Sequence, residues 1–291
     1  LVEAGVNDFV FVIGYLGDRI EQYITENYGQ YKSTFVIQTL GRGIGHAVWL
    51  ARESFAEGER MLIVLGDTIF EADLATVLAE GGNALGVKKV DDPRQFGVAE
   101  INEDGFIEHA IEKPAIPKSN NALVGLYKIK ESEILFECFQ QLFNDNIKSQ
   151  GEYNLTDALE CMIKKGVQFK SFKVKHWYDC GKKESLLETN AVLLKKSGGI
   201  SVNPNLYTNS IIIPPVSIAD DCVIENSIIG PHVTIGNNTN IKSSIVRDSI
   251  IGSYTTLDEV VLDNSLIGSD AAVKGLSRSL NIGDNTEIDF G

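Results

Sequence analysis

The first two thirds of the chain alternate between short apolar runs and amphipathic stretches. Apolar runs at 8–13, 34–38 and 61–65 are typical of strands, and the segments 17–28 and 44–57 place apolar residues at helical spacing. Strands that alternate with helices predict βαβ units around a largely parallel sheet. The run at 61–65 consists of large apolar residues only, so it is expected to be a fully buried parallel strand.

The alternation continues, with more strands, as far as residue 196. We expect further strands at 84–90, 97–101, 107–111, 122–129 and 168–174, and helices at 131–148, 155–165 and 183–196. Several of these strands follow one another without a helix between them, which favours a mixed sheet. The segment 1–196 is therefore predicted to be a mixed α/β domain.

A different pattern begins after a segment rich in Gly, Ser, Asn and Pro, which we interpret as a linker at 197–210. Helical spacing disappears, and related motifs recur as NSIIG, DSIIG and NSLIG. Aliphatic residues repeat every 16 positions, as in Ile235, Ile251 and Ile267. A fixed short period with one inward aliphatic per face predicts a parallel β-helix of hexapeptide repeats over 211–291. An antiparallel β-sandwich would instead alternate apolar and polar residues along longer strands.

The composition is that of an ordinary globular protein and argues against several functions. Of the 291 residues, 43% are hydrophobic and 23% are charged, and the apolar runs are far shorter than the ~20 residues of a membrane-spanning helix. The net charge of −14 argues against sequence-independent binding to nucleic acid or to an anionic membrane, since both require a basic face. The widely spaced cysteines predict free thiols in a reducing cytoplasm rather than zinc ligands or disulfides. They are Cys138, Cys161, Cys180 and Cys222.

Polar residues and glycines at the ends of the expected strands are candidates for ligand binding. Asp67 follows the strand at 61–65 at its carboxyl end, where open α/β sheets bind ligands, although an aspartate there is also a common helix cap or turn former. Gln38 precedes Gly43 in a glycine-rich strand-to-helix turn, which allows a ligand to approach the backbone. A tight turn alone would explain the same glycines. Gly97, inside an expected strand, indicates a bulge or a group packed against the backbone.

Charged residues further along the chain extend this set. Glu112 and Lys113 precede Pro114, and because neighbouring strand residues point to opposite faces, a shared ligand would require a bend between them. A surface ion pair at the start of a turn is the alternative. Asp179 lies at another strand-to-helix turn, so Asp67 and Asp179 could together hold one Mg²⁺, which takes one or two carboxylates and completes its shell with water and substrate phosphate. The histidines are scattered and are expected to be structural.

The order and spacing of these motifs resemble one known family. QxxxxG, LGDxIF, FGV, EKPxxPKSN, GLY, GExxLTD and WxDxGK follow one another through the first domain. This combination resembles the sugar-1-phosphate nucleotidyltransferases, most closely the glucose-1-phosphate thymidylyltransferases, and it covers nearly the whole of 1–196. The repeats resemble the β-helix that long members of the family carry. The resemblance implies a Rossmann-like mixed-sheet nucleotidyltransferase domain followed by a left-handed parallel β-helix.

The resemblance also implies roles for individual residues, with Asp67, Lys113 and Asp179 as the catalytic set. The implied roles are nucleobase contact for Gln38 and Gly43, nucleotide and Mg²⁺ binding for Asp67, Mg²⁺ binding for Asp179, sugar contact for Gly97, Glu112 and the backbone of Leu123, and phosphate contact for Lys113. The family begins with a strand and a GxGTRLxPLT loop that holds the triphosphate, and this sequence has no match to it. Because the loop that holds the triphosphate has no match here, we expect the chain to be nearly inactive by itself. Its first residues, LVEAG, resemble the last turn of a helix, so we expect the chain to begin within an element.

The implied reaction is attack of a sugar-1-phosphate oxygen on the α-phosphorus of a nucleoside triphosphate, with release of pyrophosphate. We expect dTTP before UTP, glucose-1-phosphate as the sugar, Mg²⁺ as cofactor, and a cytoplasmic homo-oligomer in nucleotide-sugar and polysaccharide biosynthesis. Two alternatives remain open. The first is that the chain is a non-catalytic regulatory or assembly subunit. The second, less favoured, is that the β-helix is an acyltransferase, with His232 as the only candidate base of the repeats.

Overall fold

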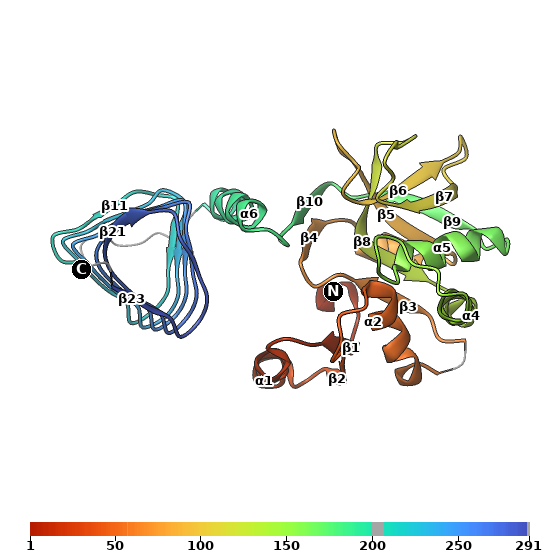
Figure 1. Cartoon of the computed structure of the whole chain (residues 1–291), viewed down its shortest axis with the longest axis horizontal. Helices are drawn as coiled ribbons and strands as arrows, with labels where there is room; N and C mark the ends of the chain where they lie inside the picture. The colour runs from red at the N-terminus through yellow and green to blue at the C-terminus, as the bar shows by residue number, and fades with distance from the viewer. Residues whose placement is uncertain (57, 199–206, 290–291) are drawn as a thin grey trace. The chain divides into compact units, whose positions relative to one another are not determined.

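The computed structural model describes residues 1–56, 58–198 and 207–289, and the chain forms two units, Leu1–Trp177 and Tyr178–Gly291 (Figure 1). The expected linker at 197–210 falls largely outside the described residues. Helix α6 (Lys183–Lys196) belongs to the second unit by its packing. The expected end of the enzymatic domain at residue 196 stays a prediction.

The first unit opens with a βαβ arrangement, as the apolar pattern predicts. A short 3-10 helix, η1 (Val2–Ala4), ends at Gly5, whose φ of 88° is the left-handed conformation that glycine adopts without strain. Strand β1 (Asp8–Ile13), helix α1 (Gly17–Tyr28) and strand β2 (Lys32–Ile37) follow. The two strands pair in parallel along their full length and form a sheet of their own.

The larger sheet of the first unit is mixed, as the succession of strands without intervening helices predicts, whereas the largely parallel sheet expected around the strands at 8–13, 34–38 and 61–65 is not formed. Its strand order is β7-β6-β8-β5-β9, and β3 also pairs with β8. Among the described strands of this sheet, only β5 and β9 pair in parallel. The strands are β3 (Met61–Val64), β5 (Asn83–Lys89), β6 (Gly97–Ile101), β7 (Ile107–Glu112), β8 (Asn121–Ile129) and β9 (Phe169–Lys173).

Strand β3 is not the fully buried parallel strand that its apolar run suggests. It pairs antiparallel with β8, with Met61 opposite Ile129, and the three residues after Met61 are only half-buried. An apolar run has the same appearance whichever direction its neighbour takes, because burial and not strand direction sets the pattern. The direction of β3 is decided by contact with a strand far along the chain.

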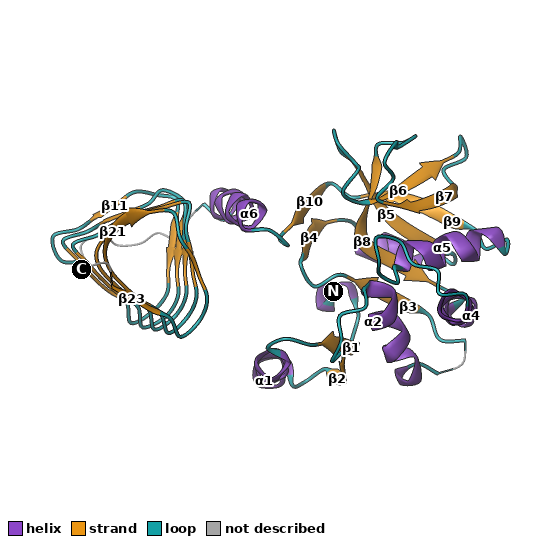
Figure 2. Cartoon of the chain, in the orientation of Figure 1, coloured by secondary structure: helices purple, strands orange, loops and turns teal. Residues whose placement is uncertain are grey.

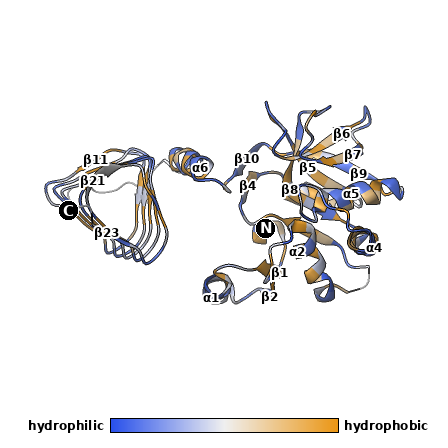
Figure 3. Ribbon diagram, in the orientation of Figure 1, coloured by the Kyte–Doolittle hydropathy of each residue, from blue (hydrophilic) through white to orange (hydrophobic). Residues whose placement is uncertain are grey.

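Three helices cover one face of the larger sheet and form the main core with it (Figure 2). Leu123 and Ile129 of β8 face this core, whereas Val124 and Leu126 face a smaller cluster on the opposite side, as the period of two of a strand requires. Hydrophobic residues accordingly concentrate on these strands (Figure 3). The helix expected at 44–57 is shorter and continues as a 3-10 turn. The elements are α2 (Ile44–Leu50), η2 (Ala51–Ser54), α4 (Ser132–Asn144) and α5 (Leu155–Lys164).

Two short strands outside the predicted strand ranges form a second small sheet, β4 (Thr68–Glu71) and β10 (His176–Asp179), the second of which ends at the strand-to-helix turn expected at Asp179. Phe70 and Trp177 pack into the smaller apolar cluster, which also receives the first residue of helix α3 (Leu74–Ala79). Both strands are too short for a clear alternation of apolar and polar residues, so only their contacts identify them.

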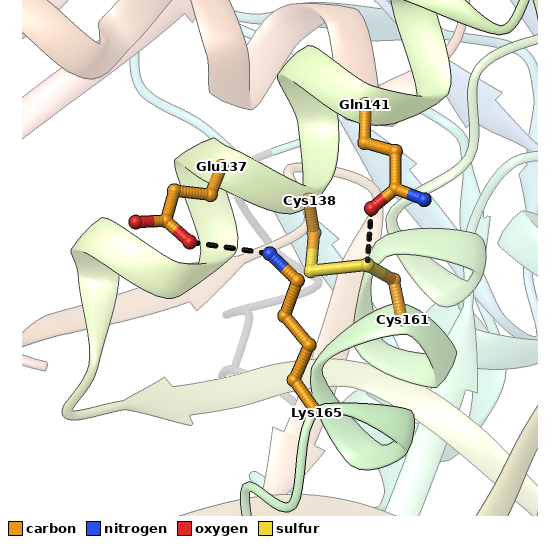
Figure 4. The surroundings of a disulfide bond; sticks show 5 residues. All are labelled: Glu137, Cys138, Gln141, Cys161 and Lys165. Carbon is orange, nitrogen blue, oxygen red and sulfur yellow. Dashed lines mark hydrogen bonds and ion pairs between the residues drawn. A yellow bond between two sulfur atoms is a disulfide. The ribbon is translucent and has the colours of Figure 1, made fainter.

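The expectation that all four cysteines are free thiols is wrong. Cys138 of α4 and Cys161 of α5 form a disulfide with their Cα atoms 5.9 Å apart, beside an ion pair between Lys165 and Glu137 (Figure 4). The cysteines are 23 residues apart, and the packing of α4 against α5 brings them together. The expectation of a reducing cytoplasm rested on free thiols and loses that support.

The second unit is a parallel β-helix, as the repeats predict, and this completes the predicted fold class. Strands of successive coils pair in parallel and form two sheets. Ile235 pairs with Ile251, and Ile251 with Ile267, so the 16-residue series stacks along the core and is fully buried. The strands are β11 (Ile211–Ile212), β12 (Val216–Ile218), β13 (Val223–Glu225), β14 (Ile228–Ile229), β15 (Val233–Ile235), β16 (Asn240–Lys242), β17 (Ile245–Arg247), β18 (Ile250–Ile251), β19 (Thr256–Asp263), β20 (Leu266–Ile267), β21 (Ala272–Arg278), β22 (Asn281–Ile282) and β23 (Glu287–Asp289).

The corners of the β-helix explain its polar repeat positions. Asn238, Asp270 and Asn285 each have a φ of 55°, in the left-handed region. Asn and Asp are the non-glycine residues that tolerate this conformation best, because their short polar side chains bond locally to the backbone. The sequence therefore encodes both the stacked core and the turns between its faces.

Candidate active site

The expected nucleobase residues meet at the start of α2. Gln38 directly follows β2, and its Nε2 donates a hydrogen bond to the carbonyl oxygen of Gly43 at 3.3 Å. Gly43 has a φ of 95°, and a Cβ at this position would lie 2.5 Å from the carbonyl oxygen of Tyr153. Both the backbone conformation and the close approach require glycine here.

A cavity of about 450 Å³ opens beside Gln38 and Gly43. Its walls include Val10 of β1, Leu65 at the carboxyl end of β3, and Glu152. The volume lies within the range of small-molecule sites, about 300–1,000 Å³. Two other cavities, of about 690 and 750 Å³, are larger, but none of the expected site residues lines them, so the chemistry favours the cavity at Gln38.

The expected sugar residues form a second cluster. Gly97 of β6 lies opposite Glu112 of β7 in the sheet, and the hydroxyl of Thr156 donates to Glu112 Oε2 at 2.7 Å. A Cβ on Gly97 would lie 2.9 Å from Thr156 Oγ1 and 3.1 Å from Leu123 Cδ1. The glycine in this strand therefore marks a close approach of other residues, which is one of the two explanations that the sequence allows.

Two carboxyl groups near this cluster, those of Glu112 and Asp157, are partly buried. Burial raises the pKa of Glu112, although the Thr156 hydrogen bond and the Lys113 charge oppose this shift. Burial also raises the pKa of Asp157, whose Oδ1 accepts a hydrogen bond from Ser149 at 2.8 Å. Asp157 Oδ2 is buried without a hydrogen-bond partner in the described part of the chain. The neutral form of both groups is favoured more than it would be in water.

The bend that a ligand shared by Glu112 and Lys113 requires is present. Strand β7 ends at Glu112, and Lys113 has a φ of 41°, in the left-handed region. Its Nζ lies 3.9 Å from Glu112 Oε1, and its side chain is half exposed. The cation is therefore on the same side as the buried carboxylate, where a ligand can contact both.

One segment that sequence reasoning did not single out joins the two clusters. The carbonyl oxygen of Tyr153 accepts a hydrogen bond from the Gly45 amide at 2.8 Å, and the Tyr153 amide donates one to the carbonyl oxygen of Arg42 at 3.0 Å. Three residues later, Thr156 holds Glu112. The motif GExxLTD contained this segment, but only its contacts reveal that it connects the base side to the sugar side.

The two expected Mg²⁺ ligands lie at the ends of strands in different units. Asp67 is exposed in the turn between β3 and β4, in the first unit, and the helix cap nearby is Asp73, whose Oδ1 accepts from the Thr76 amide. Asp179 ends β10, in the second unit, and its Oδ1 accepts from the Gly181 amide at 3.0 Å. Within the described residues, no group of three or more His, Cys, Asp or Glu is arranged to hold a metal. The two-carboxylate Mg²⁺ site stays a prediction.

Each histidine has a side-chain partner. His232, the candidate base of the repeats, lies at a corner of the β-helix, and its carbonyl oxygen accepts a hydrogen bond from Asn190 of α6 at 3.2 Å. The Nδ1 contacts are His46 with Gln38 at 3.0 Å, His109 with Glu160 at 3.2 Å, His176 with Glu71 at 2.6 Å and His232 with Asp248 at 2.7 Å.

In the described residues, no helix is long and apolar enough to cross a membrane.

Comparison with known proteins supports the family resemblance. The family model described as nucleotidyl transferase matches residues 1–196. The chain is 30% identical over 214 residues to the low-salt glycan biosynthesis nucleotidyltransferase Agl11 of Haloferax volcanii, covering 69% of this chain and 58% of that protein. It is 33% identical over 277 residues to the bifunctional protein GlmU of Methanocaldococcus jannaschii, covering 94% of this chain and 62% of that protein. The chain thus spans less than two thirds of either relative.

A solved structure agrees with this. A putative glucose-1-phosphate thymidylyltransferase from Bacillus anthracis, in complex with a sucrose, aligns with a TM-score of 0.55 and 28% sequence identity, covering 66% of this chain and 78% of that one. The motifs, the mixed sheet and the family match over more than half of the residues all agree. The chain belongs to the nucleotidyl transferase family.

Proposed function

We propose that the protein transfers a nucleotidyl group from a nucleoside triphosphate to a sugar-1-phosphate, giving a nucleoside diphosphate sugar and pyrophosphate. The favoured substrates are dTTP, then UTP, with glucose-1-phosphate as the acceptor. The observation that supports this proposal most strongly is the cluster of Gly97, Glu112 and Thr156 beside the bend at Lys113. Glu112 provides an acceptor for sugar hydroxyls, and Lys113 provides a cation for a phosphate. The nucleobase would occupy the cavity at Gln38 and Gly43.

The reaction requires little from the protein beyond position and charge. The nucleophile is a phosphate whose second pKa is about 6, so it is already ionised at neutral pH and needs no general base. The barrier lies in bringing two polyanions together in line. Lys113 holds the sugar phosphate and offsets its charge, while Glu112, kept in place by Thr156, orients the sugar ring.

Carboxylates suit the cofactor that this chemistry implies. Hard oxygen donors are the ligands that Mg²⁺ prefers, and it commonly uses one or two carboxylates together with water and phosphate. Asp67 and Asp179, each at the end of a strand, would hold it. When bound, Mg²⁺ would neutralise charge on the phosphates of the nucleotide.

The direct test is pyrophosphate release by the full-length protein. Each of dTTP, UTP, CTP, ATP and GTP is offered with glucose-1-phosphate, and the preferred nucleotide is then offered with a panel of sugar-1-phosphates. We expect the highest kcat/KM with dTTP and a lower one with UTP. A preference for ATP or GTP would overturn the nucleotide assignment, and a preference for another sugar would overturn the acceptor. No release from any pair would favour the regulatory or assembly subunit.

A further inference from the structure

The side-chain nitrogen of Gln38 has two acceptors within the chain. Nε2 lies 3.3 Å from the carbonyl oxygen of Gly43 and 3.0 Å from Nδ1 of His46. An amide nitrogen carries two hydrogens, so both are committed to the protein. Oε1 is then the atom that Gln38 can offer to a ligand in the adjoining cavity. An amide oxygen accepts hydrogen bonds and cannot donate them.

His46 accepts this hydrogen bond in the neutral tautomer that carries its hydrogen on Nε2, because Nδ1 then keeps a lone pair. Burial lowers the pKa of His46, and the charge of Arg42 lowers it further, so the neutral ring is favoured. The ring is also held in place, edge-on to Phe143 of α4 at a centroid distance of 6.4 Å. Rotating the Gln38 carboxamide by half a turn would set its oxygen against two other acceptors. One orientation is therefore selected.

We propose that His46 is a positioning residue that fixes the Gln38 carboxamide with its oxygen toward the ligand, so that the site selects a pyrimidine base with an imide N–H. The inference rests on the proposed function, which places the nucleobase at Gln38 and Gly43. Thymine and uracil carry a hydrogen at N3, whereas cytosine has a lone pair there. A fixed acceptor therefore favours thymine and uracil. With cytosine, the lone pair of N3 would face a lone pair of Gln38 Oε1.

The experiment compares His46→Phe with His46→Asn in the full-length protein. Phenylalanine keeps the ring packing against Phe143 and removes the acceptor, whereas asparagine replaces Nδ1 with an amide oxygen. Pyrophosphate release is measured with dTTP, dCTP and N3-methyl-dTTP, which lacks the imide hydrogen. We expect the parent to prefer dTTP strongly over both analogues. In His46→Phe the preference should fall about 5- to 10-fold, the loss expected for one hydrogen bond, through KM for dTTP while kcat stays within about twofold. His46→Asn should restore most of the preference.

Control measurements separate positioning from folding. His109→Phe changes a histidine that contacts Glu160 instead of Gln38, and it should leave the nucleotide preference unchanged. If His46→Phe keeps the full preference, or lowers kcat equally with every nucleotide, His46 is merely structural and the inference is wrong. If the parent uses ATP or GTP best, or releases no pyrophosphate, the proposed function fails and this inference fails with it.

Discussion

The β-helix and the first unit use their apolar residues in different ways. In the β-helix, paired residues are separated by one coil, from 15 positions (Ile267 and Ile282) to 17 (Val216 and Val233). In the first unit, the contact of Glu112 with Thr156 spans 44 positions, and β3 pairs with the distant strand β8. A repeated coil presents similar side chains at every level, whereas distant segments can bring different chemical groups to one point.

This difference explains why the nucleobase and sugar clusters lie in the first unit, whereas Asp179, a predicted Mg²⁺ ligand, lies in the second unit ahead of the β-helix. Gln38, Gly97, Glu112 and Thr156 come from four elements or the turns beside them, and no short segment could supply all four. Stability and chemistry should therefore separate between the β-helix and the first unit. Changes to the β-helix core should affect folding alone, whereas changes in the first unit should affect folding, chemistry or both.

The largest expected effect concerns the carboxylates. In the full-length protein, Asp67→Asn or Asp179→Asn should lower turnover by about 10³-fold or more, because asparagine keeps local turn hydrogen bonds but loses the charge that holds Mg²⁺. The melting temperature should stay nearly unchanged. Pyrophosphate release over a Mg²⁺ titration, together with calorimetry, measures both quantities.

Asp73 supplies the matched control, since it caps helix α3. Asp73→Ala should cost about 0.5–2 kcal/mol of stability and leave turnover unchanged. Near-normal activity with an unaltered Mg²⁺ dependence in both Asn variants would show that Asp67 and Asp179 are structural.

A core truncation in each unit tests whether the units are independent. Ile241 and Leu159 are both fully buried, the first in the β-helix and the second in α5. Changing either to Ala should cost about 2–5 kcal/mol, because transfer free energy is lost and a cavity remains. We expect Ile241→Ala to leave kcat/KM unchanged and Leu159→Ala to lower it, since α5 carries Thr156. Equal losses of activity in the two variants would contradict the separation.

Reduction of the disulfide should act on the first unit alone. The bond closes a loop of 23 residues between α4 and α5, so its loss should cost the first unit about 3 kcal/mol by the chain-entropy argument. Calorimetry with and without a reducing agent measures this. Cys222→Ser, in the β-helix, is the control and should leave the effect of the reducing agent unchanged. A similar shift in the β-helix transition would contradict the prediction.

The smallest effect is expected for Glu112→Gln. KM for the sugar-1-phosphate should rise roughly tenfold, because a neutral amide makes weaker hydrogen bonds than a carboxylate. The same substitution weakens substrate binding but should stabilise the folded protein. Burial raises the pKa of Glu112, so folding disfavours the charged form. This penalty is absent at low pH, where the carboxyl is protonated in both folded and unfolded states, and is complete above the raised pKa.

Glu112→Gln should therefore raise the melting temperature at pH 7, and its advantage should vanish as the pH falls below the ordinary glutamate pKa, about 4.3. Glu108→Gln, on an exposed position of the same strand, is the control and should show neither effect. A pH-independent gain in stability, or an unaltered KM for the sugar phosphate, would show that Glu112 has neither the burial cost nor the binding role.

The sequence by itself determined the elements that depend on neighbouring residues. The 16-residue period gave the stacking of Ile235, Ile251 and Ile267, and the alternation of apolar runs gave β1, α1 and β2. Each of these patterns reports which face of a local segment is buried, and that property can be read without knowing the partner. Strand geometry alone also showed that a ligand shared by Glu112 and Lys113 would require a bend between them, and Lys113 has the left-handed φ of such a bend.

Only the tertiary structure decided how distant segments meet. It set the antiparallel pairing of β3, the disulfide between Cys138 and Cys161, and the hydrogen bond from Thr156 to Glu112. A hydrophobic pattern specifies that a surface is covered but not what covers it or in which direction the covering strand runs. The candidate site is built from such contacts, and for this reason its residue types were recognisable in the sequence while their arrangement was not.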